Sequence, residues 1–521
     1  MILSITHKKR EKLKISLVFY FYMYYIQKIK KLAYFLIFYV ILLLLLKFTL
    51  YFLRRTTMDY HILKKYRYTN RNQFESIYSS RYKNELALHY DFEIHGFPCF
   101  SLPTTEILNL TSRIYKLTQT LIYLKSKLPQ IALEQYTQTC LVDEVKLTNE
   151  IEGVNSTRRE IQDILNTQSI TKKNMRLYGL VQKYNLLKNS EKISIHNCSD
   201  IRNIYNELVS EEIKNNDPLN LPDGIFFRRK SVSVYSPHMK EIHRGISGET
   251  EIIACMEKAL FILHNKSIPP LIRISVFHYL FGYIHPFYDG NGRTNRFISS
   301  YLLSKELEPL ISYHLAKTIK QNISKYYKSF DYTNDTDNRG DLTGFITNFL
   351  EIILASIEAL IDSLEDKIER LHYFERILLS NFKDKTDYGI LHLLLQNSLF
   401  GLEPLSAREM AEMLDKSYVT INNRLKKDSI KTLLRSDIPH KYDLDLDIVT
   451  MDLITAGEEF YATMRRSTNG GGENSPKLAG EDDFSCSMKF SAIYFSLIAQ
   501  RIIFCCEIGR ASCRERVSSP V

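Results

Sequence analysis

The chain has 521 residues, 45% hydrophobic and 25% charged, which is an ordinary composition for a protein of two or three folded domains. Its net charge of +10 is carried by residues 1–57, which hold eleven lysines and arginines against one acid. The remainder is neutral, which excludes nucleic-acid binding through overall charge and requires a local basic patch instead. The eight cysteines contain no C-x-x-C pair, so no zinc framework is expected, and scattered thiols are typical of a reducing cytosol.

Residues 1–57 form a hydrophobic, basic leader. The stretch 32–53 is almost wholly apolar and is flanked by pairs of lysines and arginines. One interpretation is a transmembrane helix that anchors the protein in a membrane. The other is that translation starts at Met58 and the leader is translated upstream DNA. We favour the second interpretation and a cytoplasmic protein, and the membrane-anchored alternative stays open.

Residues 104–360 have the apolar spacing of amphipathic helices, and a further long helix is expected over 351–380. β-signals are sparse. The clearest is the polar–apolar alternation of Ser231–Ser236, which ends at Pro237. We therefore expect a mainly α fold with one small β-hairpin.

The segment 285–296, HPFYDGNGRTNR, carries the strongest chemical signal. An apolar helix is expected before it and a new helix from its second glycine onward, so backbone N–H groups converge at a helix N-terminus that favours an anion. Arg293 and Arg296 lie three residues apart and project from one side of that helix, as expected for a phosphate site. Asp289 offers a hard oxygen ligand for Mg²⁺, and His285 is placed to take a proton from an attacking hydroxyl.

The segment is similar to the signature of the Fic family, H-P-F-x-[D/E]-G-N-G-R-x-x-R, at every fixed position. The resemblance implies a helical Fic core and transfer of AMP from ATP to a Ser, Thr or Tyr hydroxyl of a protein. Relatives that phosphorylate instead carry Lys in place of the second glycine, so Gly292 favours nucleotidyl transfer. The resemblance implies these roles: general base, His285; Mg²⁺ ligand, Asp289; anion hole, Gly290, Asn291 and Gly292; partners of the β- and γ-phosphates, Arg293 and Arg296.

The resemblance extends to two further regions of the expected catalytic domain, residues 104–360. Gly224–Arg228 and the residues after it resemble the flap that holds the target as an added strand. Tyr326 or Tyr327 is expected to line the adenine pocket, although aromatic residues at helical spacing more often belong to a core. The flap residues expected to dock the target are Ser231, Val232, Ser233, Val234 and Tyr235.

Residues 148–153, TNEIEG, fit the inhibitory motif [S/T]-x-x-x-E-[G/N] that many Fic proteins carry. The motif consists of Thr148, Glu152 and Gly153, and the same pattern also describes an ordinary helix end with a terminal glycine. We expect Glu152 to pair with Arg296 and so to occupy the site of the γ-phosphate, which makes the enzyme autoinhibited.

A second module is expected at 384–449. Residues 406–427 have the spacing of a helix-turn-helix and resemble the winged-helix modules appended to many Fic proteins, although no clear wing follows. Arg424, Lys426 and Lys427 form a small basic patch, so DNA docking and a purely structural cap remain alternatives.

The tail, residues 457–521, is expected to contribute little. A glycine-rich linker signal precedes a segment, 507–517, that resembles the translation of a sequencing-adapter oligonucleotide.

The leading hypothesis is an autoinhibited protein adenylyltransferase that uses ATP and Mg²⁺ on an unidentified protein target, with self-modification as one outcome. One alternative is a DNA-binding regulator whose Fic core senses nucleotide or modifies only itself. Another is a Fic enzyme that uses a different donor or removes AMP. A homodimer is compatible with the sequence.

Overall fold

The computed structural model describes residues 60–69, 71–166, 176–188, 191–235, 241–435 and 440–450. The chain divides into two units, residues 1–449 and residues 450–521. The expected leader at 1–57 and the expected tail at 457–521 lie outside the described residues.

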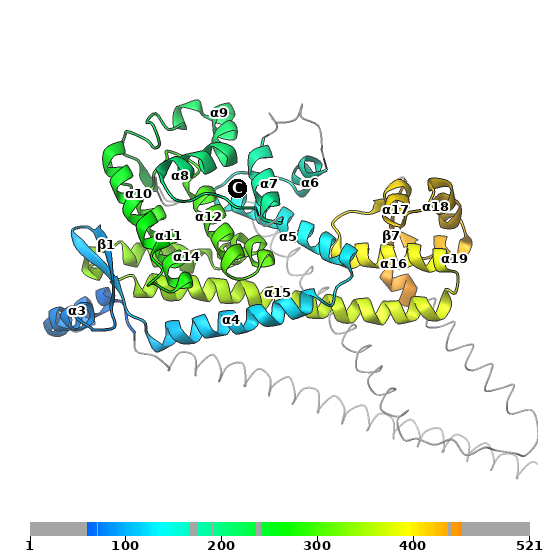
Figure 1. Cartoon of the computed structure of the whole chain (residues 1–521), viewed down its shortest axis with the longest axis horizontal. Coiled ribbons are helices and arrows are strands. Elements are labelled where there is room, and N and C mark those ends of the chain that lie inside the picture. Colours follow the sequence, from blue (N-terminus) through cyan, green and yellow to red (C-terminus); the bar gives the residue numbers. More distant parts are fainter. Residues whose placement is uncertain are drawn as a thin grey trace, which may run out of the picture. The chain divides into compact units, whose positions relative to one another are not determined.

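The fold is mainly α, as expected, with three small antiparallel sheets among the described residues (Figure 1). A π-helical turn, η3 (Asn206–Ser210), joins α8 to α9. The α-helices are α2 (Leu63–Thr69), α3 (Phe74–Tyr82), α4 (Thr105–Lys125), α5 (Gln130–Ile151), α6 (Arg158–Leu165), α7 (Tyr178–Lys188), α8 (Cys198–Tyr205), α9 (Glu211–Asn216), α10 (Glu249–His264), α11 (Pro270–Ile284), α12 (Asn291–Glu306), α13 (Leu315–Gln321), α14 (Ile323–Thr333), α15 (Thr343–Asn381), α16 (Lys385–Phe400), α17 (Ala407–Met413), α18 (Tyr418–Leu425) and α19 (Asp428–Lys431). The strands are β1 (Leu88–Ile94), β2 (Phe97–Ser101), β3 (Ser233–Tyr235), β4 (Glu241–Arg244), β5 (Leu405–Ser406), β6 (Leu434–Arg435) and β7 (Lys441–Leu444).

The centre of the core is α11, which is apolar on all sides and is enclosed by α10, α12 and α15. A helix without a polar face needs neighbours all round it, and this explains its position. The long helix α15 lies beside α4 along the base of the core (Figure 1). These contacts fix the end of α11 and the start of α12, where the HPFYDGNGRTNR segment lies.

Of the described helices, α15 is long and apolar enough to cross a membrane. However, 67% of its most apolar window is buried inside the protein, and a core helix of a soluble protein has the same properties. The apolar stretch 32–53, where a membrane anchor was considered, lies outside the described residues.

Residues 60–101, which precede the expected catalytic domain, pack onto the same core. Arg339 forms a bidentate ion pair with Glu75, with both distances 2.6 Å, and its guanidinium also lies over the ring of Phe74. The β1–β2 hairpin extends this contact, since Phe100 donates from its backbone to the carbonyl of Gly340. This part of the fold was not anticipated from the sequence.

The expected flap forms the β3–β4 hairpin, in which Ser233 pairs with Arg244. The strand is shorter than the alternating pattern, because Ser231 and Val232 precede it. Residues 236–240 of the connecting turn lie outside the described residues.

The C-terminal module has two short helices, α17 and α18, which are followed by a pair of short strands. Ser406 caps α17 in a capping box with Glu409, and Ser417 caps α18. The strands pair in the order β5–β7–β6. The expectation that no wing follows is therefore wrong: β6 and β7 are only two and four residues long, too short for a clear alternation.

This C-terminal module rests on α5. Gln135 donates to the side chain of Asn397 (2.8 Å), and Thr139 donates to the carbonyl of Phe400 (2.8 Å). The opposite end of α5 carries the expected inhibitory motif, so one helix links the module to the candidate site.

Candidate active site

The loop between α11 and α12 is shaped by two residues in the left-handed backbone region. His285 ends α11 with φ +51°, and Gly290 precedes α12 with φ +79°. A Cβ at Gly290 would lie 2.8 Å from the side chain of Val209, so glycine is required there for space as well as for conformation. The two bends let α12 begin directly after the loop, so the N-terminus of α12, which favours an anion, lies at the end of the loop.

Asn291 holds the loop in this shape with its side chain. Its Oδ1 accepts from the backbone N–H of Phe287 (2.9 Å), and its Nδ2 donates to the carbonyl of the same residue (2.8 Å). Both polar atoms of the side-chain amide thus have a partner within the loop, which fixes the position of this side chain.

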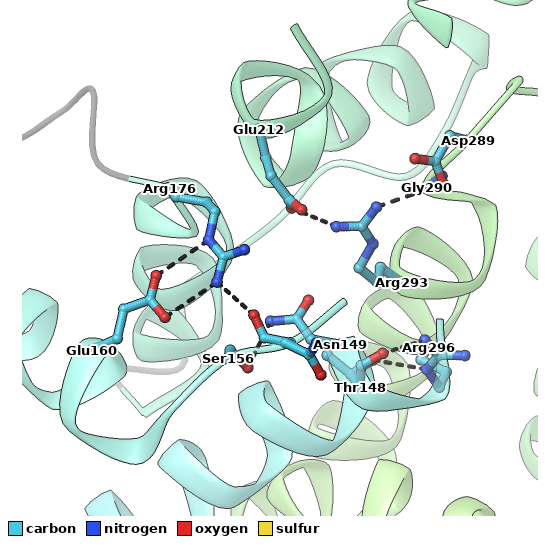
Figure 2. Close-up of polar contacts among 11 residues, drawn as sticks. Thr148, Asn149, Ser156, Glu160, Arg176, Glu212, Asp289, Gly290, Arg293 and Arg296 are labelled. Carbon is cyan, nitrogen blue, oxygen red and sulfur yellow. Dashed lines mark hydrogen bonds and ion pairs between the residues drawn. The ribbon is translucent and has the colours of Figure 1, made fainter. Parts of the chain in front are cut away.

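Arg296 is almost fully buried and faces the expected inhibitory motif (Figure 2). Its Nη1 forms an ion pair with Glu152 Oε1 at 2.7 Å. Its Nε and Nη2 donate to the hydroxyl and the carbonyl of Thr148, at 2.7 and 2.8 Å. Although burial opposes its charge, the pKa of Arg296 is raised because the Glu152 carboxylate lies beside it.

The carboxylate of Glu152 also lies against the start of α12. A Cβ added to Gly292 would come within 2.0 Å of Glu152 Oε1. The carboxylate therefore occupies the space beside the first turn of α12, next to Arg296, where an anion would be favoured.

The backbone after Glu152 is held by several contacts. Gly153 leaves α5 with φ +75°, and Val154 donates to the carbonyl of Asn149 (2.9 Å). Arg176, which also pairs with Glu160, donates to the carbonyl of Asn155 at 2.5 Å (Figure 2). The motif is thus both a helix end with a terminal glycine and an ordered segment that presents Glu152 to Arg296.

Deeper in the site, Glu144 lies two turns before Glu152 on α5. It is fully buried and accepts from the backbone N–H of Ala316 at 2.8 and 2.9 Å. Burial raises the pKa of Glu144 to about 8, against the lowering effect of that hydrogen bond and of the Arg296 charge.

Arg293 also faces a carboxylate, one that the sequence did not reveal. Its Nη1 lies 2.5 Å from Glu212 Oε2 on α9, and both side chains are buried (Figure 2). Its Nη2 lies 3.6 Å from Asp289 Oδ1. Glu212 carries no motif and is 81 residues distant in sequence, so only the fold reveals this pair.

His285 is positioned by Arg228, a second residue whose role was not predicted. The buried Arg228 guanidinium donates to the carbonyls of His285 (2.9 Å), Ile284 (3.4 Å) and Lys230 (2.5 Å). It therefore joins the base of the flap to the end of α11, where the helix dipole favours a cation. Burial lowers the pKa of Arg228 to about 10.

The environment of His285 favours a neutral imidazole. Burial lowers its pKa to about 4, and the neighbouring His243 and Arg228 act in the same direction. A neutral ring is the form that can accept a proton.

The two tyrosines on α14 differ in their surroundings. Tyr326 is buried, and its hydroxyl is hydrogen-bonded to Nε2 of the buried His278 at 2.8 Å. Tyr327 is 42% exposed; burial of its hydroxyl raises its pKa, the Glu152 charge acts in the same direction and the Arg296 charge opposes them. Tyr327 therefore has the free ring surface that a nucleotide base would need, whereas Tyr326 belongs to the core.

The basic patch of the C-terminal module is largely neutralised. Arg424 pairs with Asp384 (2.8 Å) and Asp387 (2.9 Å), and Lys427 pairs with Asp387 (2.6 Å). Of the three residues expected to form the patch, two therefore serve internal ion pairs that join α18 to α16, which weakens the case for a phosphate-binding surface.

The donor set at the loop suits a magnesium ion shared with phosphate. Asp289 offers a half-exposed carboxylate, and no group of three or more His, Cys, Asp or Glu side chains able to hold a metal occurs among the described residues. A single hard oxygen beside a phosphate site matches Mg²⁺, which usually takes one or two carboxylates and fills its other positions with phosphate oxygens and water.

Comparisons with known proteins agree with this geometry. Residues 196–303 match the Fic/DOC family. The Drosophila melanogaster protein adenylyltransferase Fic is 30% identical over 196 residues, which is 36% of this chain and 36% of the relative. The Drosophila virilis protein of the same name is 37% identical over 76 residues, 15% of each chain. The matches thus span about a third or less of the curated relatives.

A solved Fic family protein from Desulfovibrio desulfuricans G20 aligns with 66% of this chain and 97% of its own, at 18% identity and a TM-score of 0.41. The domain match includes the whole segment from His285 to Arg296. Residues 196–303 of this chain are therefore similar to the Fic/DOC family.

Proposed function

We propose that this protein transfers AMP from ATP to a Ser, Thr or Tyr hydroxyl of a protein target, and that Glu152 inhibits it. The observation that carries the proposal is the position of the Glu152 carboxylate, against Gly292 and 2.7 Å from Arg296. A carboxylate held at that point marks an anion site built from a helix N-terminus and a buried guanidinium. The names of the Drosophila relatives support the identity of the reaction.

In the proposed reaction, the neutral imidazole of His285 accepts the proton of the target hydroxyl. The hydroxyl oxygen attacks the α-phosphorus of ATP, the bond from that phosphorus to the bridging oxygen breaks, and pyrophosphate leaves with the electron pair. Arg293 and Arg296 neutralise the charge of the departing phosphates. Asp289 would hold Mg²⁺, which supplies further charge neutralisation when bound.

The β3–β4 hairpin is the proposed docking site for the target. Residues Ser231–Tyr235 lead into and form β3, and an extended target segment would add to this small sheet through main-chain hydrogen bonds. Arg228 connects this hairpin to His285, which supports the view that target docking and catalysis share one rigid frame.

Inhibition follows from the same contacts. While Glu152 pairs with Arg296, the γ-phosphate has no cationic partner there, and ATP lacks the orientation that an in-line attack requires. Removal of the carboxylate frees the arginine. Self-modification is the readout expected first, because it needs no knowledge of the target.

The experiment compares ATP labelled at the α-phosphorus with ATP labelled at the γ-phosphorus, using the Glu152→Gly chain and Mg²⁺. AMP transfer predicts label on protein from α-labelled ATP alone, lost when His285→Ala is added. Label from γ-labelled ATP would identify phosphorylation and contradict the proposal. Absence of label from both donors, with target lysate present, would favour another donor or AMP removal.

A DNA-binding regulator is the second candidate, and the resemblance of α16–α18 and β5–β7 to a winged helix is the observation that favours it. Its weakness is the ion pairing of Arg424 and Lys427 with Asp384 and Asp387. DNA binding that persists in the His285→Ala chain would support this candidate.

A further inference from the structure

Each of the two arginines that the proposed reaction requires is paired with a carboxylate, and the two carboxylates come from different elements. Glu152 at the end of α5 pairs with Arg296, and Glu212 on α9 pairs with Arg293. The first belongs to the inhibitory motif. The second lies outside that motif and is separated from it by α6, α7 and α8.

Arg293 is less exposed to solvent than the arginine of a phosphate site at a protein surface would be. Its side chain is 1% exposed and that of Glu212 is 5% exposed. Its Nε has no hydrogen-bond partner among the described residues. A guanidinium with so little exposed surface cannot pair with a phosphate that arrives from solvent unless a covering group moves.

The covering group is the segment from the end of α8 to α9, which contains the π-helical turn η3. Tyr205 stacks on Phe287 of the catalytic loop, with ring centroids 3.8 Å apart. Val209 and Ile213 face Gly290, 2.8 and 3.4 Å from where its Cβ would lie. Glu212 lies within this segment, between Val209 and Ile213, so its carboxylate stays on Arg293 as long as the segment stays on the loop.

Stability is a weak explanation for this arrangement. Two buried charges lose their hydration, and a buried pair often contributes little to the free energy of folding compared with apolar side chains of the same size. A phosphate oxygen has the same chemistry as Glu212 Oε2, because each is a charged acceptor for a terminal guanidinium nitrogen. Glu212 and a phosphate group therefore compete for one donor.

We infer that Glu212 is a second inhibitory carboxylate, which the donor's β-phosphate must displace from Arg293 before ATP binds productively. This inference rests on the proposed function. Glu212 acts independently of Glu152 because it comes from a different element and contacts a different arginine. A nucleotide without a β-phosphate does not engage Arg293 and is insensitive to Glu212.

The test measures dissociation constants of AMP and ADP with Mg²⁺ by calorimetry, on the 521-residue chain carrying Glu152→Gly. Glu212→Gln is added to one sample. Glu211→Gln is added to the matched control, because this neighbour on α9 is exposed and its substitution removes the same charge. We expect Glu212→Gln to tighten ADP about tenfold, which corresponds to about 1.4 kcal/mol, with AMP and the control unchanged.

ADP binding that is unchanged or weakened by Glu212→Gln overturns the inference and makes Glu212 a residue that merely orients Arg293. Equal tightening of AMP and ADP also overturns it, because a general charge effect would then suffice. Failure of every variant to bind any nucleotide contradicts the proposed function itself. Should Glu212→Gln not fold, Glu212→Asp keeps the charge but shortens the reach, and a smaller, ADP-specific tightening is expected.

Discussion

Arg228 is predicted to determine the catalytic rate although it lies outside the catalytic loop. The three carbonyls that accept from Arg228 differ in whether they have another partner. The carbonyl of Lys230 belongs to an exposed residue and can bind water, and the carbonyl of Ile284 also accepts from the backbone N–H of Ile246 (3.1 Å). Among the described residues, the guanidinium is the one donor to the carbonyl of His285, so this carbonyl loses its partner when Arg228 is replaced. Loss of one hydrogen bond to a charged group costs about 1.5–3 kcal/mol.

The cost falls on His285, the residue proposed as the general base. His285 has φ +51°, a conformation that non-glycine residues adopt only when their surroundings hold them there. In the Arg228→Met chain, we expect this conformation to lose its support. If the activation free energy rises by about 1.5–3 kcal/mol because His285 is less well oriented, kcat falls roughly 10- to 150-fold.

The assay measures AMP transfer in the Glu152→Gly background, with kcat and the KM for ATP determined separately. Arg229→Met is the matched control, because Arg229 is 65% exposed and lies next in the chain. Arg228→Met should lower kcat and leave KM nearly unchanged, whereas the control should change neither. An unchanged kcat, or a loss confined to KM, would refute a positioning role for Arg228.

Three further predictions concern charge. Burial lowers the pKa of His285 to about 4, and loss of the Glu152 charge lowers it further, so transfer by the Glu152→Gly chain should stay constant from about pH 8 to about pH 5. A fall centred near the ordinary histidine value of about 6.5 would contradict the buried environment. The pKa of Glu144 is raised to about 8 in the folded protein, so its carboxyl group keeps a proton there. The stability that this bound proton contributes is fully present below the pKa of the unfolded chain, near 4.5, and is lost as pH rises through 8. The measurement compares the free energy of unfolding in urea at about pH 6 and about pH 9, and Glu144→Gln should remove the loss of stability seen in wild type. Each tenfold difference in proton affinity between the folded and unfolded chains corresponds to roughly 1.4 kcal/mol. An identical pH dependence in wild type and Glu144→Gln would contradict this prediction. Glu152→Gly should lower the melting temperature without nucleotide, because Arg296 loses its partner, and MgATP should raise it more than in wild type; equal increases in melting temperature would argue against competition for Arg296.

The catalytic loop was predictable because its chemistry is contiguous. The residues from His285 to Arg296 form one uninterrupted turn between two helices, so spacing alone brings the histidine, glycines and arginines together. The pairing of Glu152 with Arg296 spans 144 residues, and the expectation that they meet agrees with the 2.7 Å ion pair. It came from the family motif rather than from any local pattern.

The remaining features depend on packing that no local pattern records. Glu212 meets Arg293 because a π-helical turn places α9 over the loop, and a single glutamate carries no sequence signal of that turn. Arg228 was visible at the start of the flap, but its acceptors are backbone carbonyls, which every residue has. The short strands of the wing gave too little alternation to detect.

The charges of the C-terminal module also could not be interpreted correctly from local sequence alone. Arg424 and Lys427 look like a free basic patch in the sequence, because their acidic partners lie about 40 residues earlier on α16 and at its cap. Charge counted along a chain cannot show which charges are already paired.

The central claim is that one carboxylate, that of Glu152, holds a competent AMP-transfer site closed. The most direct measurement is incorporation of label from α-labelled ATP into the wild-type, Glu152→Gly and Glu150→Gln chains. Glu150 is the matched control, since it lies on the same helix but pairs with Lys146 and Lys320. Our account predicts strong labelling with Glu152→Gly and wild-type levels with Glu150→Gln. Equal labelling of all three chains would contradict it.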